Sequence, residues 1–251
     1  RMIPSRGGPA PSIHVFAPRA QLRRPQLASL TQTPHAHRSH HDRYTRLRTD
    51  QAPPTHGEQT YPETMSDISI PRIGSLEPAP ALDHLDLLAP PVAAALTALA
   101  ERGVATASSA LVVAIDPELA DTEVMTREFG MDLALSSNCI LVAGKRAGEE
   151  RIAACVVRAT TNADVNHVVK KRLDVRKASF WPQERAVEAS GMEYGGITPV
   201  GIPGSWRLLI DSACAVGWSC IGSGLRRSKL FVTGEVLAAL PGAEIVEGLG
   251  V

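Results

Sequence analysis

The loop 193–205, with the sequence EYGGITPVGIPGS, is the segment best suited to bind a ligand or support a reaction through its backbone groups. Six of its thirteen residues are Gly or Pro, and the loop is apolar as well, unlike a solvated linker. Gly195 and Gly196 allow positive φ or close approach of another group, and Pro199 fixes one φ. Such a loop presents backbone N–H and C=O groups in a fixed array, which can bind a polar ligand or stabilise an oxyanion. A tight surface turn is the alternative interpretation.

The elements that must position this loop can be predicted from hydrophobic patterning. Residues 138–143 and 151–158 are apolar runs on either side of a charged turn, which predicts an antiparallel hairpin at the centre of a sheet. Since simple βαβ units are few, we expect an α/β (α+β) fold with a mixed, mostly antiparallel sheet, curled or barrel-like, and helices packed outside. Helices are predicted at 92–101, 122–129, 163–173, 183–189 and 234–240, and further strands at 110–115, 206–211, 219–221, 229–232 and 243–246.

The chain divides into three parts by composition. Residues 1–64 hold nine Arg, no Lys and four acidic residues, without hydrophobic periodicity, and predict a disordered or non-native extension. A targeting peptide and a basic arm for RNA are the alternatives, but Met65 has the context of an ordinary start, which favours an upstream translated extension. Residues 65–90 form an irregular lead-in, and residues 91–251 form the folded domain.

The folded part is mildly acidic, because residues 65–251 hold 17 basic and 22 acidic residues. This balance excludes a broadly cationic nucleic-acid-binding surface, so any RNA would be held through a local patch or one end. The four Cys form no CxxC pair and predict buried thiols in a reducing compartment, and they lack the His spacing of a zinc site. No apolar run is long enough to span a bilayer, so we expect a cytoplasmic protein with no membrane partner.

The loop and its flanking segments resemble the YbaK-like family, which includes the editing domain inserted in bacterial prolyl-tRNA synthetases and free-standing trans-editing relatives. The run Gly195-Gly196-Ile197-Thr198-Pro199-Val200-Gly201 is similar to the family's GGxxP-x-G loop. The hairpin NCILVAGKRAGEERIAACVVRATT resembles its two central strands, and the segments around 163–177, 190–192 and 209–212 follow in the family's order. The resemblance covers about residues 95–248, and five ordered segments make it more specific than a lone GxxxP motif.

This resemblance implies an aminoacyl-tRNA deacylase that hydrolyses the ester between a wrong amino acid and the terminal adenosine of tRNA. Fidelity requires such a second site, because synthetase pockets separate small side chains poorly. The family's glycine loop holds the aminoacyl group through its main chain, which assigns substrate binding to Ile197, Thr198, Pro199 and Gly201. The resemblance implies no metal and no organic cofactor. It implies aminoacyl-tRNA as the partner, through its acceptor end, and leaves an aminoacyl-tRNA synthetase open as a second partner.

One residue departs from the family pattern. Relatives carry a lysine two residues before the aliphatic run of the first hairpin strand, and here that place is Asn138. Asn can donate a hydrogen bond to an ester or ribose oxygen but contributes no charge. Three outcomes follow: hydrolysis supported mainly by backbone donors, a different substrate, or a catalytically silent module that binds an aminoacyl-adenosine or amino acid. The neighbouring Cys139 is expected to be a buried structural thiol and not a nucleophile, since no His stands at a readable distance.

Charged residues after the loop supply further candidates. Lys229 falls where relatives carry a pocket-lining His or Ser, so we expect it to turn into the site; a solvent-facing Lys beside Arg226 and Arg227 is the alternative. Asp211 matches an acid of some relatives and could orient a substrate amine or water, or else form an ion pair with an Arg such as Arg207. Arg226, Arg227 and Lys229 form a compact basic patch that could meet acceptor-stem phosphates.

Overall fold

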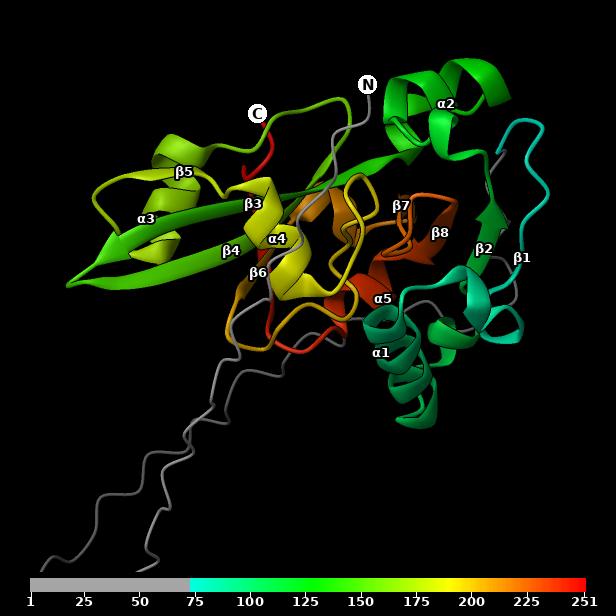
Figure 1. Cartoon of the computed structure of the whole chain (residues 1–251), viewed down its shortest axis with the longest axis horizontal. Helices are drawn as coiled ribbons and strands as arrows, with labels where there is room; N and C mark the ends of the chain where they lie inside the picture. The colour runs from blue at the N-terminus through cyan, green and yellow to red at the C-terminus, as the bar shows by residue number, and fades with distance from the viewer. Residues whose placement is uncertain (1–72) are drawn as a thin grey trace, which may run out of the picture. The chain divides into compact units, whose positions relative to one another are not determined.

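The computed structural model describes residues 73–251, so the extension predicted at 1–64 lies outside the described residues. Within this range the chain is a mixed α/β structure, which confirms the predicted class (Figure 1). The strands are divided between a five-stranded and a four-stranded sheet that stay separate and do not close into a barrel. The outcome is an α/β fold in which two sheets, and not one curled sheet, carry the site.

The larger sheet contains the predicted hairpin. Its order is β5-β3-β4-β6-β9, with β3 and β4 antiparallel over ten residues each and β4, β6 and β9 parallel to one another. Ala147 and Gly148 form the hairpin turn, both at positive φ, so the turn is shorter than the charged stretch of the sequence suggests. The strands span Ser137–Arg146 (β3), Glu149–Arg158 (β4), Ala178–Phe180 (β5), Arg207–Asp211 (β6) and Ala243–Val246 (β9).

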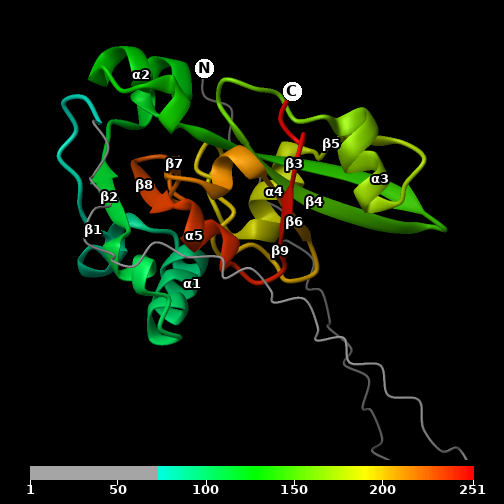
Figure 2. The same cartoon turned by 180° about the vertical axis from the view of Figure 1, so that it is seen from behind.

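The smaller sheet is antiparallel throughout and has the order β1-β2-β8-β7. It meets the larger sheet at a single parallel bridge between Ser136, just before β3, and Cys220 on β7. Figure 2 shows β7 and β8 beside the start of β3 from behind. Its strands span Ala79–Pro80 (β1), Leu111–Ala114 (β2), Trp218–Gly222 (β7) and Ser228–Thr233 (β8).

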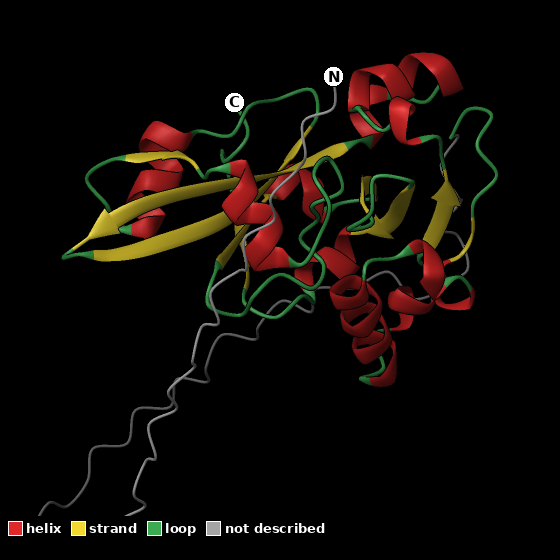
Figure 3. Ribbon diagram, viewed as in Figure 1, coloured by secondary structure: helices red, strands yellow, loops and turns green. Residues whose placement is uncertain are grey.

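The helices lie around the two sheets (Figure 3). They are α1 (Pro90–Glu101), α2 (Thr122–Phe129), α3 (Lys170–Leu173), α4 (Gln183–Ser190) and α5 (Gly234–Ala238). Glycines end α2 and α4 in the left-handed conformation, as predicted at Gly130 and Gly191. The helix expected at 163–173 differs, because its first part, Val165–Val169, is a π-helical turn capped by the carboxylate of Asp164. No helix between residues 73 and 251 is both long and apolar enough to cross a membrane.

Apolar side chains fill three layers. The largest cluster lies between the sheets and contains Val112 and Leu230 of the smaller sheet with Val156 and Ile210 of the larger one. A second cluster packs α3 onto the outer face of the larger sheet, and a third packs α2 onto the outer face of the smaller sheet. The described part of the lead-in, 73–90, also reaches the core, since Ala81 is fully buried. These layers fix the junction of the two sheets, where the site lies.

Candidate functional site

A cavity of about 450 Å³ lies where the two sheets meet. Segments far apart in the sequence form its walls: the start of α2, the start of β3, the β5–α4 junction, the glycine loop, the end of β7 and the start of β8. Four of the predicted site residues line it: Asn138, Gly195, Ile197 and Lys229. The fold therefore brings the glycine loop, Asn138 at the family's lysine position and the candidate cation Lys229 to one open cavity.

The first half of the glycine loop forms part of the cavity wall. Gly195 has φ of 77°, and the Gly196 amide donates to the carbonyl of Glu193 at 3.0 Å, which closes a turn. Among residues 73–251, no acceptor is assigned to the amides of Gly195 and Ile197, both of which line the cavity. Because both residues line the cavity, their N–H groups are candidate donors to a ligand.

The loop is locked against the β7–β8 turn through glycine backbone. The Gly224 amide donates to the carbonyl of Gly196 at 2.8 Å, and the Glu193 amide donates to the carbonyl of Gly224 at 2.8 Å. A Cβ on Gly222 would collide with the carbonyl oxygen of Gly196, and a Cβ on Gly196 would collide with the backbone of Leu225. Gly196 is thus buried as a packing residue, while its neighbours face the cavity.

The middle of the loop, residues 198–200, is buried on the side of α1. Thr198 is fully buried, and Pro199 is also buried. Gly201 has φ of 80°, and a Cβ there would collide with the carbonyl of Pro91 in the first turn of α1. Thr198, Pro199 and Gly201 therefore do not line the cavity; they hold the part of the loop that does.

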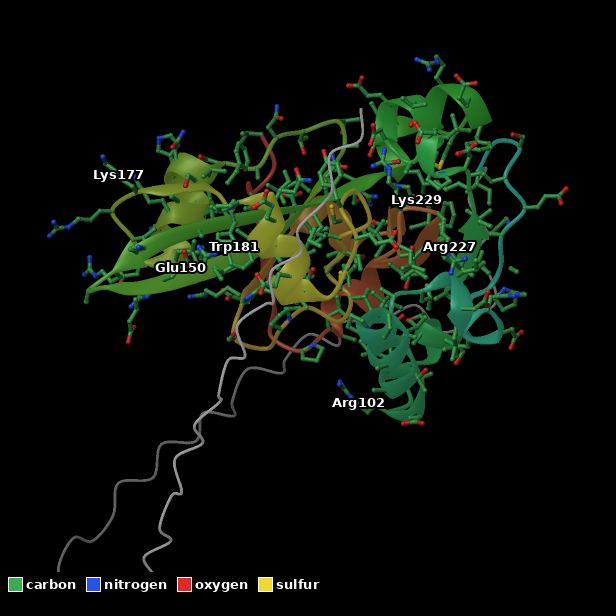
Figure 4. The ribbon with its side chains drawn as sticks, in the orientation of Figure 1. Arg102, Glu150, Lys177, Trp181, Arg227 and Lys229 are labelled. Atoms are coloured by element: carbon green, nitrogen blue, oxygen red, sulfur yellow. The ribbon has the colours of Figure 1, made fainter. Side chains whose placement is uncertain are left out.

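Lys229 is buried, with 7% of its surface exposed, and its side chain lines the cavity. Figure 4 places it below α2. Desolvation lowers the pKa of its ammonium, and the nearby Cys220 and Asp121 offset part of this shift. Within the described part of the chain, no ion pair or hydrogen bond joins this ammonium to another residue. Lys229 thus faces inward, as one of the two sequence interpretations expected.

Asn138, at the start of β3, lines the same cavity and is half buried. The Thr122 hydroxyl, in the first turn of α2, donates to its Oδ1 at 3.2 Å. Because the amide oxygen is engaged there, the amide nitrogen is the end of the side chain left to donate. Asn138 is therefore a neutral donor held in place by α2.

The two arginines of the predicted basic patch are both engaged. Arg226 forms an ion pair with Asp121 at 3.3 Å and lies over the ring of Tyr194 at 5.8 Å. Arg227 donates to the carbonyl of Asp86 at 2.8 Å and is exposed outside the cavity. Arg226 thus ties the loop to α2 at the cavity rim, and the three basic residues do not present one free patch.

Asp211 stands apart from the cavity. Its carboxylate accepts from the amide of Ala213 at 2.9 Å and from the amide of Gly250 at 2.8 Å. Arg207, the other partner considered for it, pairs with Glu244 instead. The acid therefore caps the turn after β6 and holds the chain near residue 250, and the structure does not bring it to Asn138 and Lys229.

The cavity also contains residues that the sequence did not single out. Trp181 forms part of its wall and packs edge-on against Trp206, with ring centroids 5.2 Å apart. The hydroxyl of Ser136 is buried and has no partner within 73–251. Phe180 and Tyr194 also line the cavity, yet they are 70% and 57% exposed. In the sequence, these residues are recognisable only as aromatic residues next to a loop. That pattern does not distinguish a residue at the rim of a cavity from a residue in the hydrophobic core.

Both thiols in the cavity wall, Cys139 and Cys220, have a raised pKa. Burial raises the pKa of the Cys139 thiol far above its usual range and raises the pKa of Cys220 to about 12. No group of three His, Cys, Asp or Glu that could hold a metal ion is found in the range 73–251. What the cavity offers instead is two backbone donors, one amide donor and one desolvated cation. This set is suited to stabilising negative charge on an oxygen.

Known proteins resemble this chain in sequence and in fold. Residues 116–240 match the family model of the aminoacyl-tRNA editing domain. No curated protein matches the chain. A solved structure described as a candidate trans-editing enzyme for prolyl-tRNA synthetase matches with a TM-score of 0.51 and 19% identity, over 64% of this chain and 97% of its own. A hypothetical protein matches with a TM-score of 0.51 and 18% identity, over 61% of this chain and 99% of its own. Residues 116–240 thus resemble the aminoacyl-tRNA editing domain family, and the fold of the described chain is similar to that of a trans-editing candidate.

Proposed function

We propose that this chain is a trans-editing aminoacyl-tRNA deacylase, which hydrolyses the ester between a wrong amino acid and the terminal adenosine of a tRNA. The observation that carries the proposal is the meeting of the Gly195 and Ile197 amides, Asn138 and Lys229 around one open cavity. The match of residues 116–240 to the aminoacyl-tRNA editing domain supports an aminoacyl-tRNA as the substrate.

The proposed mechanism depends on electrostatic stabilisation and on no acid–base pair of side chains. The carbonyl oxygen of the ester accepts from the amides of Gly195 and Ile197. Water adds to the carbonyl carbon, and the negative charge that forms on the oxygen is stabilised by these donors and by the Lys229 ammonium. The C–O bond to the ribose then breaks, and a proton from the water ends on the ribose oxygen. The products are the free amino acid and an uncharged tRNA.

In this mechanism Lys229 replaces the charge that relatives carry on β3. The family's lysine position is Asn138 here, and the cation comes instead from β8, on another wall of the same cavity. Since Lys229 is desolvated, its charge acts through a medium of low dielectric constant and is more effective than a surface charge. Asn138 donates to the ribose or to the ester oxygen of the substrate.

We assign the activity to the compartment where charged tRNA is used, the cytoplasm, in keeping with four free cysteines. The partners are the acceptor end of an aminoacyl-tRNA and, for delivery of the substrate, an aminoacyl-tRNA synthetase. The domain arrangement that we propose is an editing domain over 91–251, preceded by the lead-in 65–90 and an extension at 1–64.

The test is a panel of tRNAs, each charged with its correct or an incorrect radiolabelled amino acid and incubated with the purified chain. We expect hydrolysis of the ester above the buffer rate for at least one mischarged tRNA. The Lys229→Met variant should not hydrolyse that ester above the buffer rate. Arg102→Met is the matched control, because Arg102 is an exposed cation outside the cavity. Tight binding of a charged tRNA without ester loss would contradict the deacylase and support a silent binding module.

A further inference from the structure

Exposed cations gather at one end of the domain, far from α2. Residues 145–177 contain nine basic and four acidic residues, a net charge of +5, whereas 73–251 contain 16 and 21, a net charge of −5. Eight of these nine cations lie on the tip of the β3–β4 hairpin, on α3 and on the segment that leads to β5. The ninth, Arg158, lies at the other end of β4 and donates to the carbonyls of Ala213 and Trp218. Lys177 marks this end in Figure 4. Positive charge is therefore concentrated on a domain that is otherwise acidic.

The fold builds this cluster by close packing at Gly144. A Cβ on Gly144 would collide with the side chain of Val175 and would press on the carbonyl of Lys177. Gly144 also pairs with Ala178 of β5. The lack of a side chain at Gly144 thus lets the segment after α3 cross the hairpin directly, which brings Lys177 beside Lys145.

Part of this charge is not neutralised within the described chain. Arg146 and Arg151 share Asp174, and Arg172 pairs with Glu244. Four other cations are exposed and form no ion pair within residues 73–251: Lys145, Lys171, Arg176 and Lys177. We call these four residues the basic end.

Strand β5 connects the basic end to the cavity. It starts immediately after Lys177 and ends at Phe180, which is 70% exposed and lines the cavity. The next amide, that of Trp181, donates to the carbonyl of Leu141 in the cavity wall at 2.8 Å. Tyr194, 57% exposed, lines the same cavity from the glycine loop. Two exposed aromatic side chains therefore line the cavity, and β5 leads from one of them, Phe180, to the unpaired cations of the basic end.

Exposed aromatics beside cations are the combination that binds single-stranded nucleic acid, by base stacking and phosphate contacts. We propose that the surface from Phe180 to the basic end is the tRNA-binding surface of this domain. Phe180 stacks on an unpaired base next to the terminal adenosine, and the basic end contacts phosphates of the acceptor stem. This inference rests on the proposed function, since it takes the cavity as the site of the terminal adenosine.

The length of β3 sets the distance between the cavity and the basic end. Asn138 and Lys145 are seven residues apart on one strand, about 23 Å at the usual rise of a strand. A tRNA joins a short unpaired 3′ end to a duplex, so its bases and its phosphates would be presented in that order along β5. An acidic protein would satisfy the cations but would leave the exposed Phe180 unexplained.

The first test is binding of uncharged tRNA to the full chain at several salt concentrations. Neutralising the basic end (Lys145→Gln, Lys171→Gln, Arg176→Gln and Lys177→Gln together) should weaken binding at least tenfold and reduce the slope of log Kd against log salt by about 2 to 4. Lys177→Gln alone should weaken binding more than Arg102→Gln, the matched control at an exposed Arg outside this surface. Phe180→Ala should weaken binding about tenfold, and Phe180→Trp should preserve it.

The second test separates this inference from the proposed function. A small ester, 3′-O-aminoacyl-adenosine, reaches the cavity without touching the basic end. The fourfold variant should hydrolyse this ester at the wild-type rate, while its kcat/KM for charged tRNA falls at least tenfold. Unchanged tRNA binding and salt slope in the variant would overturn the inference, even if hydrolysis persists. Unchanged tRNA binding with lost binding of polyglutamate would overturn it in favour of an acidic protein partner. If the wild-type chain hydrolyses neither substrate but binds tRNA through the basic end, the proposed function fails and the binding surface stands.

Discussion

The hydroxyl of Thr122 donates to Oδ1 of Asn138 at 3.2 Å, and this bond fixes which end of the Asn138 amide can donate into the cavity. We expect Asn138→Ala to lower kcat/KM for a mischarged tRNA about tenfold, the effect of losing one neutral hydrogen bond worth about 1.4 kcal/mol. Single-turnover hydrolysis measures this loss.

Thr122→Val checks the positioning role of that bond. In the wild-type background it should lower kcat/KM a few-fold, because the amide of Asn138 is no longer oriented. In the Asn138→Ala background it should have no further effect, since nothing remains to be oriented. Additive losses in the double variant would show that Thr122 acts independently of Asn138.

Lys229 is predicted to act through its charge. Lys229→Met removes the ammonium with little change in volume and should lower kcat/KM at least 100-fold, about 2.7 kcal/mol of transition-state stabilisation. The same variant should raise the free energy of unfolding by about 1 kcal/mol, because a desolvated cation without a close partner costs stability. Urea titration and single-turnover rates measure the two effects, and a variant that loses both activity and stability would contradict this role.

The stabilisation by Lys229→Met should depend on pH with a definite sign. Burial lowers the pKa of Lys229 in the native state, while the unfolded chain keeps the ordinary lysine value. Below the native pKa both states are charged, and the cost of burial is fully present. As the pH rises through the native pKa toward the ordinary value, the native state releases its proton first, so wild-type stability rises. The advantage of Lys229→Met should therefore shrink as the pH increases, and a constant advantage would exclude this cause.

The glycine contact between the loop and β7 gives a matched pair of variants. Gly222→Ala places a Cβ against the carbonyl of Gly196 and should destabilise the fold by about 2 kcal/mol or more, with loss of hydrolysis. Gly204→Ala, in the glycine loop itself, places its Cβ in open space and should change the free energy of unfolding by less than about 0.5 kcal/mol. Thermal unfolding distinguishes the two, and equal effects would show that the loop is not locked at Gly196.

Asp211 should act on stability alone. Asp211→Asn weakens two hydrogen bonds from backbone amides, those of Ala213 and Gly250, and should lower the free energy of unfolding by about 1–2 kcal/mol. Under conditions where the variant is folded, kcat/KM should stay within about twofold of wild type, because the carboxylate does not line the cavity. A large loss of kcat in the folded variant would instead place this acid in the reaction.

Much of the fold could be predicted from local patterns, because hydrophobic periodicity and Gly or Pro punctuation decide local structure. The hairpin of β3 and β4 and the ends of α2 at Gly130 and of α4 at Gly191 follow from such patterns. The division into two sheets could not be predicted, since it depends on pairings between distant strands, such as β2 with β8.

The site was partly predictable for the same reason. The loop was singled out by its Gly and Pro content. The inward position of Lys229 was one of two interpretations, and it came from the resemblance to the editing family. The roles of Asp211 and Arg226 depend on partners far away in the chain, Gly250 and Asp121, which no local pattern contains. Tyr194 and Phe180 were missed because solvent exposure is a property of the folded surface.

The seam between the loop at Gly196 and the β7–β8 turn at Gly222 and Gly224 consists of main chain on both sides. Side-chain replacements elsewhere in the cavity wall, at Met125, Ile140 or Trp181, leave that seam untouched. Under the proposed function, the shape of the pocket can therefore change from one amino acid substrate to another during evolution while the backbone amides of the loop keep their positions. Side chains would then set which amino acid is accepted, while the backbone would set how the ester is bound, and the two properties would evolve separately.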